Sequence, residues 1–376
     1  TRKNFRACIV RQASLYQSKM LSQDQFSSPT MRFRLALKSR PGAIRHALGN
    51  RAYPHPPKPT IDRVTVAAVQ MQLELLDDGA QFASKLYHLV HQAVERDAQL
   101  IVFPEYAWLP LLGLLPATRD LVADGITLAN ADRATIATLL RALAPAIKTI
   151  FETTGSELAA RFGVYLMPGT TITVDKAGHL YNTAYLFGPN GALIGTQNKL
   201  HLTRLETEWM TRGSELQVFT LPFARVALPV CMDYSYWETT RAATLRGADI
   251  LLGFSAEEKA SEFFLAMRGI ASRLQESHAF GIQACCVTHL FGLNFGGPSY
   301  IAAPLGMHRA ATIFLARTST PNVEQVISAK LDLAHLREFR RATPRDFNPE
   351  LYRKYLPRLY AAWRAQLLQD GKRRII

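Results

Sequence analysis

Short apolar runs alternate along the chain with longer segments in which apolar residues recur every three or four positions. The first pattern is typical of buried β-strands, and the second is typical of helices with one buried face. Strands are predicted at residues 64–69, 100–103, 163–167, 170–174, 181–187, 225–230, 249–254, 280–287 and 299–303. Helices are predicted at residues 81–96, 132–158, 237–246 and 263–276. This alternation predicts an α/β fold.

Local residues refine two of these elements. Asp132 is expected to cap the helix of residues 132–158, and Pro145 predicts a break within it, because proline lacks a backbone donor and clashes with the preceding turn. Residues 176–179 include a glycine between two predicted strands and indicate a turn. Residues 170–187 should therefore form a hairpin.

One predicted strand ends in a thiol. The apolar residues 225–230 stop at Cys231, and polar and aromatic side chains follow at once. A thiol in this place can be presented to a substrate at the edge of a sheet while the strand holds its backbone. The alternative is an inert core cysteine, since free cysteine is among the most buried residue types.

Two further segments place a charged residue at a strand end. Glu105 follows the apolar residues 100–103 and a proline, and Lys199 follows the strand-like residues 192–194. Taken alone, each fits a solvated surface residue equally well. Together with Cys231 they form the set of nucleophile, base and cation that thiol chemistry needs.

Several separated motifs resemble the carbon-nitrogen hydrolase family, or nitrilase superfamily, whose members carry a Glu, a Lys and a Cys in this order. The motifs that contain these three residue types are Phe103-Pro104-Glu105, Asn198-Lys199-Leu200-His201-Leu202 and Cys231-Met232-Asp233. The match continues at residues 66–71, 181–184, 246–252, 296–299 and 331–333, and it spans about residues 64–336. The resemblance implies a four-layer αββα sandwich.

The resemblance also implies a chemistry. Cys231 would attack the carbon of a carbon–nitrogen bond and form a thioester, with Glu105 as its base and Lys199 as the cation that stabilises the oxyanion. A thiol has an unperturbed pKa of about 8.5, so it needs such a base near neutral pH. The backbone N–H of Met232 is expected to join Lys199 at the oxyanion.

Glu206 completes the predicted catalytic set. It lies seven residues after Lys199 and matches a second glutamate that orients the substrate or the lysine in many family members. Glu208 is close by and is an alternative for this role, and a plain loop carboxylate is another. His201 is expected to be a packing or hydrogen-bonding residue rather than a catalyst.

The residue four positions after the cysteine bears on the substrate. Many relatives have an arginine there, and it helps to hold the substrate carboxylate in N-carbamoyl amino acid hydrolases. Ser235 stands in its place and argues against a carboxylate-bearing substrate. We expect an aromatic pocket with an acidic residue for a cationic group, although the aromatic residues also suit a core and the acid a solvated position. The predicted pocket residues are Tyr106, Trp108, Tyr234, Trp237 and Glu257.

These residues favour an amidase or N-carbamoyl hydrolase that acts on a small non-peptide molecule and releases ammonia or an amine. A nitrilase with the same three residues is one alternative, and a catalytically idle fold that binds nucleic acid or serves as a basic scaffold is another. We expect no metal and no cofactor, because no residues have metal-ligand spacing. Cys8, Cys285 and Cys286 indicate no disulfide framework, which favours a reducing compartment, the cytoplasm.

The net charge of +14 is concentrated at the two ends of the chain. Residues 1–60 hold 12 Lys and Arg against 1 acidic residue, and residues 337–376 hold 11 against 4. We therefore divide the chain into a basic N-terminal extension with a proline-rich linker at 1–60, a carbon-nitrogen hydrolase domain at 61–336 and a basic tail at 337–376. An Arg-rich start is also typical of organelle-targeting peptides, but we favour an arm that packs on its own body or on a partner subunit.

The basic tail interleaves Tyr352, Tyr355, Tyr360 and Trp363 with arginines and lysines. That pattern fits a nucleic-acid surface, and it equally fits an amphipathic helix that covers a neighbouring subunit. Related hydrolases assemble through such tails, so we expect a homodimer or higher homo-oligomer and no nucleic-acid partner. No apolar run reaches the roughly 18 residues of a membrane span, so we expect none.

Overall fold

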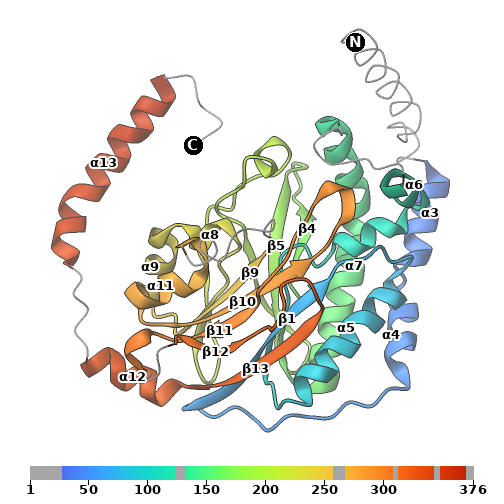
Figure 1. The fold of residues 1–376 in the computed structure, drawn as a ribbon. Helices are drawn as coiled ribbons and strands as arrows, with labels where there is room; N and C mark the ends of the chain where they lie inside the picture. The colour runs from blue at the N-terminus through green and yellow to red at the C-terminus, as the bar shows by residue number, and fades with distance from the viewer. Residues whose placement is uncertain (1–27, 124–131, 257–266, 308–311, 343–347, 370–376) are drawn as a thin grey trace, which may run out of the picture. The chain divides into compact units, whose positions relative to one another are not determined.

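The computed structural model describes residues 28–123, 132–256, 267–307, 312–342 and 348–369. The chain divides into two compact units, Thr1–Leu336 and Arg337–Ile376. The first unit contains the sheet and the segments that carry the candidate catalytic residues (Figure 1).

The described residues of the first unit form a mixed sheet of 13 strands. Its middle strand, β1 (Arg63–Gln72), pairs in parallel with β2 (Leu100–Val102) and β10 (Phe280–Val287), and antiparallel with β13 (Gln325–Asp332). From β1 the strands run outward in the orders β2-β3-β5-β4 and β10-β9-β8-β7, with β6 beside β5, β11 beside β10 and β12 beside β11. The remaining strands are β3 (Tyr165–Met167), β4 (Thr170–Val174), β5 (Leu180–Phe187), β6 (Leu193–Asn198), β7 (Val218–Thr220), β8 (Arg225–Ala227), β9 (Ile250–Ser255), β11 (Tyr300–Ala302) and β12 (Phe314–Arg317).

Strands β1 and β10 pair at two positions near their carboxyl ends, so the sheet consists of two halves that meet at this junction. Helices α5 (Gly79–Val94) and α7 (Arg133–Phe162) cover one half, and α9 (Trp237–Leu245) and α11 (Ile270–Ser277) cover the other (Figure 1). The layers are thus helix, strand, strand and helix. The predicted α/β class and its four-layer arrangement are confirmed.

Helix α7 runs without interruption through Pro145, so the predicted break is wrong. Asp132 is its N-cap, as predicted, and accepts a 2.8 Å hydrogen bond from the Thr135 N–H. Apolar residues are buried on both sides of the proline, including Leu143 and Ile147. Their packing outweighs the backbone hydrogen bond that proline cannot make.

Among the described helices, α7 has the length and apolar composition that would suffice for a membrane span. Of its most apolar 18-residue window, 50% is buried inside the fold. A core helix meets the same criteria, and α7 packs against α5 and β4. Its composition is therefore accounted for by this packing.

The predicted helix of residues 263–276 is interrupted in the structure. Helix α11 begins at Ile270, because Gly269 before it has an extended backbone with φ −68° and ψ 166°. Residues 257–266 lie outside the described part of the chain. The prediction of one continuous helix across Gly269 is therefore wrong.

The predicted strand of residues 225–230 is shorter in the structure. Strand β8 ends at Ala227, and Val230 forms a single bridge to Phe254. Pro229 lacks the N–H that a continuous ladder needs. The chain before Cys231 nevertheless remains beside β9 through this bridge.

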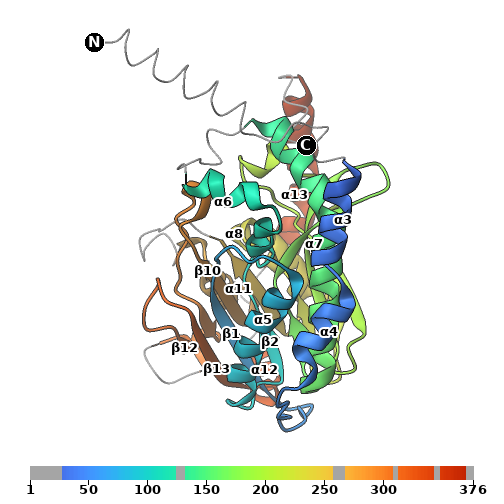
Figure 2. The same cartoon turned by 90° about the vertical axis from the view of Figure 1, so that its right-hand side faces the viewer.

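The basic N-terminal extension contributes two described helices, α3 (Pro29–Lys38) and α4 (Pro41–Gly49). Ile44 and Leu48 of α4 are fully buried in the same apolar cluster as residues of α5 and α7. Figure 2 shows α3 and α4 alongside α7. The described part of the extension therefore belongs to the first unit and packs against α5 and α7, whereas residues 1–27 lie outside the described residues.

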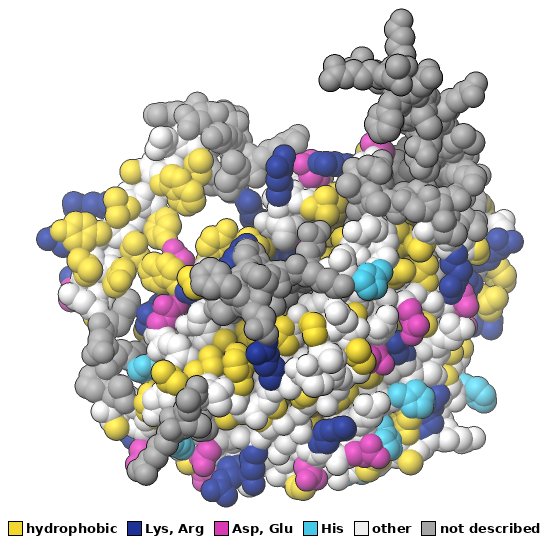
Figure 3. Space-filling view, in the orientation of Figure 1, with side chains coloured by type: hydrophobic (Ala, Val, Ile, Leu, Met, Phe, Trp, Pro, Cys, Tyr) yellow, Lys and Arg dark blue, Asp and Glu magenta, His cyan; other side chains and the backbone are white. Residues whose placement is uncertain are grey.

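The second unit contains α13 (Pro349–Gln369), and α12 (Leu333–Ala342) spans the boundary between the units in the sequence. Apolar side chains along α13 are exposed, and Figure 3 shows such groups in yellow beside basic groups in dark blue. The exposed large apolar residues of this helix are Leu351, Tyr355, Leu359, Tyr360 and Trp363. The predicted role of this tail in subunit packing stays a prediction.

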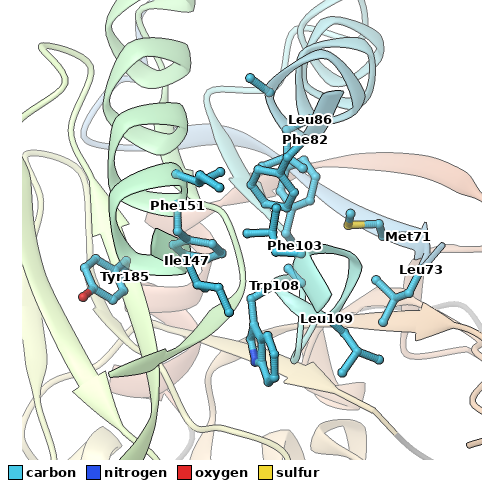
Figure 4. Close-up of a cluster of buried hydrophobic side chains, with 14 of the residues drawn as sticks. Met71, Leu73, Phe82, Leu86, Phe103, Trp108, Leu109, Ile147, Phe151 and Tyr185 are labelled. Carbon is cyan, nitrogen blue, oxygen red and sulfur yellow. The ribbon is translucent and has the colours of Figure 1, made fainter. Parts of the chain in front are cut away.

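The apolar core of the first unit fixes the segment around Glu105. Phe82 of α5 and Phe151 of α7 lie in one cluster with Phe103 and Trp108 (Figure 4). Phe103 is fully buried and Trp108 is 3% exposed. Burial of one such large side chain stabilises the fold by roughly 1.5–3 kcal/mol. Because Phe103 and Trp108 flank Glu105 in the chain, their packing holds the carboxylate in place.

Candidate active site

Glu105 and Cys231 lie beyond the carboxyl ends of strands in the parallel part of the sheet, whereas Lys199 follows β6, which pairs antiparallel with β5. Glu105 follows β2, and the Ala256 N–H that follows β9 donates a 3.1 Å hydrogen bond to its carboxylate. Cys231 follows Val230, which bridges to the end of β9 at Phe254. Strand order, rather than closeness in the sequence, brings these residues together.

Lys199 joins two carboxylates in the protein interior. Its Nζ lies 2.7 Å from Glu105 Oε1 and 2.8 Å and 3.0 Å from the two carboxylate oxygens of Glu206. The side chains of Lys199 and Glu105 are 1% exposed, and that of Glu206 is 3% exposed. Buried charges need such partners, because moving an isolated ion out of water is strongly unfavourable.

Glu105 is the member of this cluster that titrates near neutral pH. Burial raises the pKa of Glu105 to about 7, the Lys199 ammonium opposes this rise, and the Glu206 carboxylate adds to it. The Glu105 carboxylate also accepts hydrogen bonds from Asn182 Nδ2 at 2.8 Å and from the thiol of Cys231. A carboxyl group with this pKa can take and return a proton near pH 7, as a general base and acid must.

The other two members hold their charges. Burial would lower the pKa of Lys199, but the charges of Glu105, Cys231 and Glu206 raise it above its ordinary value. Burial would raise the pKa of Glu206, but the charge of Lys199 and hydrogen bonds from Lys199, Tyr106 and a backbone N–H lower it. The cluster therefore combines a permanent ammonium, a permanent carboxylate and one group that exchanges protons.

Cys231 lies at a sharp turn directly before the short helix α8 (Met232–Ser235). Its backbone has φ +46° and ψ −101°, a region that residues other than glycine rarely occupy. Its N–H donates a 2.9 Å hydrogen bond to Phe254 O. Such strain persists where the surrounding structure enforces it, and it is concentrated at functional sites. The strain and the contact with Glu105 favour a reactive thiol over an inert core cysteine, and the nucleophile role of Cys231 stays a prediction.

Met232 is the first residue of α8, directly after the thiol. An N–H in the first turn of a helix has no acceptor within the helix, so this donor is not used by helical bonding. Lys199 supplies a fixed positive charge in the same cluster. The arrangement is compatible with the oxyanion role predicted for both groups.

Two of the predicted pocket residues lie at this cluster or beside it. The Tyr106 hydroxyl donates a 2.5 Å hydrogen bond to Glu206 Oε1. Trp108 packs edge-on against the Tyr106 ring, with the ring centroids 6.5 Å apart. Tyr106 has a positive φ of 56°, so the chain turns sharply directly after Glu105. These aromatic residues therefore border the buried carboxylates.

Of the other predicted pocket residues, the structure describes Tyr234 and Trp237. Tyr234 is fully buried in a separate apolar cluster with residues of β9 and α11. Trp237 is the first residue of α9 and is partly buried. Glu257 lies outside the described residues. Tyr234 is therefore a core residue, and a pocket role for Trp237 and Glu257 stays a prediction.

Asn182 is a site residue to which the sequence assigns no role, although it lies in one of the matching motifs. It belongs to β5, and its Nδ2 donates to Glu105 at 2.8 Å and to Glu206 at 3.3 Å. Its uncharged amide group therefore bridges the two carboxylates. Its signal in the sequence is an amide within an otherwise buried strand, since buried polar groups need partners.

Asp233 is a second residue of this kind, two positions after Cys231. It is fully buried and accepts hydrogen bonds from the backbone N–H groups of Leu200 and His201. The His201 ring, predicted to be a packing or hydrogen-bonding group, lies with Nδ1 3.1 Å from Asp233 Oδ1. Asp233 thus connects the segment after the lysine with the turn that carries the thiol.

Within the described part of the chain, no group of three or more His, Cys, Asp and Glu residues could hold a metal ion. Cys231, Cys285 and Cys286 are not in disulfides, and Cys8 lies outside the described residues. Burial raises the pKa of Cys286 well above its ordinary value, and the neighbouring charge of Cys285 raises it further. Cys286 is therefore kept as a neutral thiol. That the chain needs no cofactor stays a prediction.

Comparison with known proteins gives concordant sequence matches. The family model described as carbon-nitrogen hydrolase matches residues 65–341. A nitrilase from Pyrococcus abyssi (strain GE5 / Orsay) is 30% identical over 279 residues, which cover 74% of this chain and 93% of that protein. The omega-amidase NIT2 of Danio rerio is 27% identical over 201 residues, which cover 50% of this chain and 69% of that protein.

Among solved structures, the fold is similar to an amidase mutant from Nesterenkonia sp. AN1 with a TM-score of 0.57 and 19% identity. The similarity covers 79% of this chain and 98% of that chain. In that structure the acetamide moiety of fluoroacetamide is covalently added at the active-site cysteine. At this level of identity the likeness shows the fold.

Proposed function

The chain belongs to the carbon-nitrogen hydrolase family, and we propose that it hydrolyses an amide or N-carbamoyl group of a small non-peptide molecule through a thioester on Cys231. One observation carries the proposal. Lys199 contacts the carboxylates of Glu105 and Glu206, and Glu105 also accepts the hydrogen bond of the Cys231 thiol. A nucleophile, a base and a fixed cation therefore belong to one hydrogen-bonded cluster, as thiol catalysis requires.

In the first half of the proposed reaction, Glu105 takes the proton of the Cys231 thiol as the sulfur attacks the amide carbon. The carbonyl oxygen becomes an oxyanion, which the Lys199 ammonium and the Met232 N–H stabilise. The carbon–nitrogen bond then breaks. Ammonia or an amine leaves with the proton that Glu105 returns, and the acyl group remains on sulfur as a thioester.

In the second half, water attacks the thioester carbon while Glu105 takes one of its protons. The same two donors stabilise the second oxyanion. The carbon–sulfur bond breaks, the acid product leaves, and Cys231 recovers its proton. Glu105 thus serves twice as base and twice as acid, for which a pKa of about 7 is suitable.

Glu206 supports this cycle by keeping Lys199 charged. Each time Glu105 takes a proton, the lysine loses the negative charge of one partner. Glu206 remains ionised at 2.8 Å, and the Tyr106 hydroxyl holds its other oxygen. The positive charge next to the oxyanion is therefore preserved in every step.

A nitrilase is the second candidate, because the Pyrococcus abyssi relative carries that name. The same thiol would add to the carbon of a nitrile and give a thioimidate. Addition of water and loss of ammonia would then give the thioester that the amide route also forms. The two routes differ in the bond attacked first, so only turnover of the two substrate classes separates them.

The test is ammonia release from a panel of amides, N-carbamoyl compounds and nitriles, with Cys231→Ala measured in parallel. Cys285→Ala is a matched control, because it removes a different buried thiol. We expect turnover of at least one member, its loss in Cys231→Ala and its retention in Cys285→Ala. Absence of turnover for the whole panel, together with a Cys231 thiol that iodoacetamide does not alkylate, would contradict the proposal and favour a scaffold role.

A further inference from the structure

The carboxylate of Asp233 joins two backbone segments of the candidate active site. Its Oδ2 accepts a 2.9 Å hydrogen bond from the N–H of Val230, the residue before the nucleophile. Its Oδ1 accepts hydrogen bonds from Leu200 at 3.0 Å and from His201 at 2.7 Å, the two residues after Lys199. One fully buried side chain therefore connects the backbone beside the thiol to the backbone beside the ammonium.

On the thiol side, Asp233 holds both polar backbone groups of Val230. Its carboxylate accepts from the Val230 N–H, and its own N–H donates a 2.9 Å hydrogen bond to the Val230 carbonyl. The next residue, Cys231, has the strained φ of +46°. Strained backbone returns to relaxed values unless its neighbours are fixed. Asp233 supplies that fixation directly before the nucleophile.

On the lysine side, the backbone of Lys199 is held by two hydrogen bonds of its own. Its N–H donates to Asn182 O at 2.8 Å, and its carbonyl accepts from the Gly213 N–H at 2.8 Å. The next two N–H groups of the chain both donate to Asp233. The long lysine side chain therefore extends from a backbone segment that is fixed on both sides.

The His201 ring adds a third type of contact to the same carboxylate. Its Nδ1 lies 3.1 Å from Asp233 Oδ1, and the ring contacts that of Tyr236 in a tilted arrangement, with the centroids 4.6 Å apart. The histidine side chain is 39% exposed, whereas that of Asp233 is fully buried. The imidazole thus lies between the buried carboxylate and solvent and restrains its orientation.

We propose that Asp233 is a positioning residue for hydrolysis, which holds the Cys231 turn and the Lys199 segment in a fixed mutual geometry, with His201 restraining its carboxylate. Its oxygens face backbone donors and an imidazole, so it acts through other residues. The inference rests on the proposed function, in which thiol and ammonium must meet the same carbon and its oxygen. A misplacement of about 1 Å can lower such a rate roughly 100-fold.

The first test compares Asp233→Asn with Asp175→Asn. Asparagine keeps the shape of the side chain, but both oxygens of Asp233 face N–H donors, so its amide group must oppose a donor. Asp175, in the turn between β4 and β5, accepts from the N–H groups of Ala177 and His179 and contacts the His179 ring at 2.9 Å. It is a matched control that reproduces the carboxylate–imidazole contact away from the site. We expect kcat to fall at least 30-fold in Asp233→Asn with little change in KM, and both to be unchanged in Asp175→Asn.

The second readout is the pH dependence of Cys231 alkylation by iodoacetamide, which needs no substrate. We expect a rate at least tenfold lower at pH 7 and a displaced midpoint in Asp233→Asn, with a normal profile in Asp175→Asn. A role limited to folding would lower Tm and leave alkylation per folded molecule unchanged, and that result would overturn the inference. A wild-type protein with normal alkylation but no turnover would instead overturn the proposed function alone.

If Asp233→Asn does not fold, the inference is tested with His201→Gln, and His179→Gln is the control. The side chain of His201 is partly exposed, so its replacement is compatible with folding. We expect a two- to tenfold fall in kcat and a displaced alkylation midpoint relative to His179→Gln. Identical profiles for the two histidine variants would show that the Asp233 contacts serve folding alone, and the inference would be rejected.

Discussion

Lys199 Nζ lies 2.7 Å from Glu105 Oε1, and both side chains are 1% exposed. A contact of this length between buried opposite charges would ordinarily hold the carboxylate in its ionised form. Burial and the nearby Glu206 nevertheless raise the pKa of Glu105 to about 7, against the effect of the lysine. The pair therefore holds a carboxyl group ready to exchange a proton beside a cation that keeps its charge.

The first prediction concerns the acid side of the pH profile. The carboxylate form of Glu105 is the base, and its pKa is about 7. We expect kcat/KM to rise with pH and to become constant above about pH 7, because the active form accumulates as the proton leaves. Initial rates between pH 5 and pH 9 measure this. Glu105→Gln should lose at least about 100-fold in kcat/KM, and a wild-type profile without an inflection near 7 would remove Glu105 from the role of base.

The second prediction uses the coupling between the two carboxylates. The Glu206 charge is one cause of the raised pKa of Glu105. Glu206→Gln should therefore move the inflection of the pH profile below 7. It should also lower kcat at least about tenfold, because Lys199 loses its charged contacts at 2.8 Å and 3.0 Å.

Glu208→Gln is the control for that prediction. Glu208 lies two residues further on and forms a surface ion pair of 2.7 Å with Arg133. Such exposed pairs contribute about 0–1 kcal/mol, so this variant should retain both the rate and the inflection. Equal effects of the two variants would indicate a change in the loop rather than a role for the buried carboxylate.

The third prediction concerns stability. Lys199→Met leaves Glu105 and Glu206 buried without their cation, which should reduce the free energy of unfolding at pH 8 by about 3–5 kcal/mol. Without the lysine, both carboxyl groups have a raised pKa in the folded state. Their contribution to stability is then present below the unfolded pKa of about 4.3 and is lost as pH rises through the folded values. The deficit should therefore be smaller at pH 5 than at pH 8.

Urea unfolding at the two pH values measures this difference. Lys148→Met is the control, because Lys148 forms an exposed helix pair of 2.6 Å with Glu152. Its loss should change the free energy of unfolding by less than about 1 kcal/mol at either pH. A Lys199→Met deficit that is equal at pH 5 and pH 8 would contradict the assignment of uncompensated carboxylates.

The sequence predicts the parts of the site that depend on local pattern. The apolar runs before Glu105 and Cys231 end where strands or strand bridges end in the structure. Glu105 and Cys231 come together because of the strand order around β1, which is set by pairing between distant segments. Periodicity carries no such information, so the expectation that these residues meet came from the family resemblance.

For two kinds of residue, the local sequence pattern could not predict the structural role. Asn182 and Asp233 act through hydrogen bonds to segments far away in the sequence, and nothing beside them in the chain reveals those partners. Pro145 has a strong local preference to break a helix, but the packing of α7 on its neighbours prevails. Tertiary contacts decided the outcome in each case.

The last prediction concerns self-association through α13. Leu359 and Trp363 lie one helical turn apart and are 60% and 56% exposed, whereas Ala361 lies on the opposite face of a helix with 3.6 residues per turn. Because exposed apolar faces of this kind are typical of interaction surfaces, we expect two or more copies of the chain to associate there. The double variant Leu359→Glu with Trp363→Glu should shift the mass measured by light scattering to that of a monomer, and Ala361→Glu should not. A wild-type protein that is monomeric at micromolar concentration would show that this face serves another purpose.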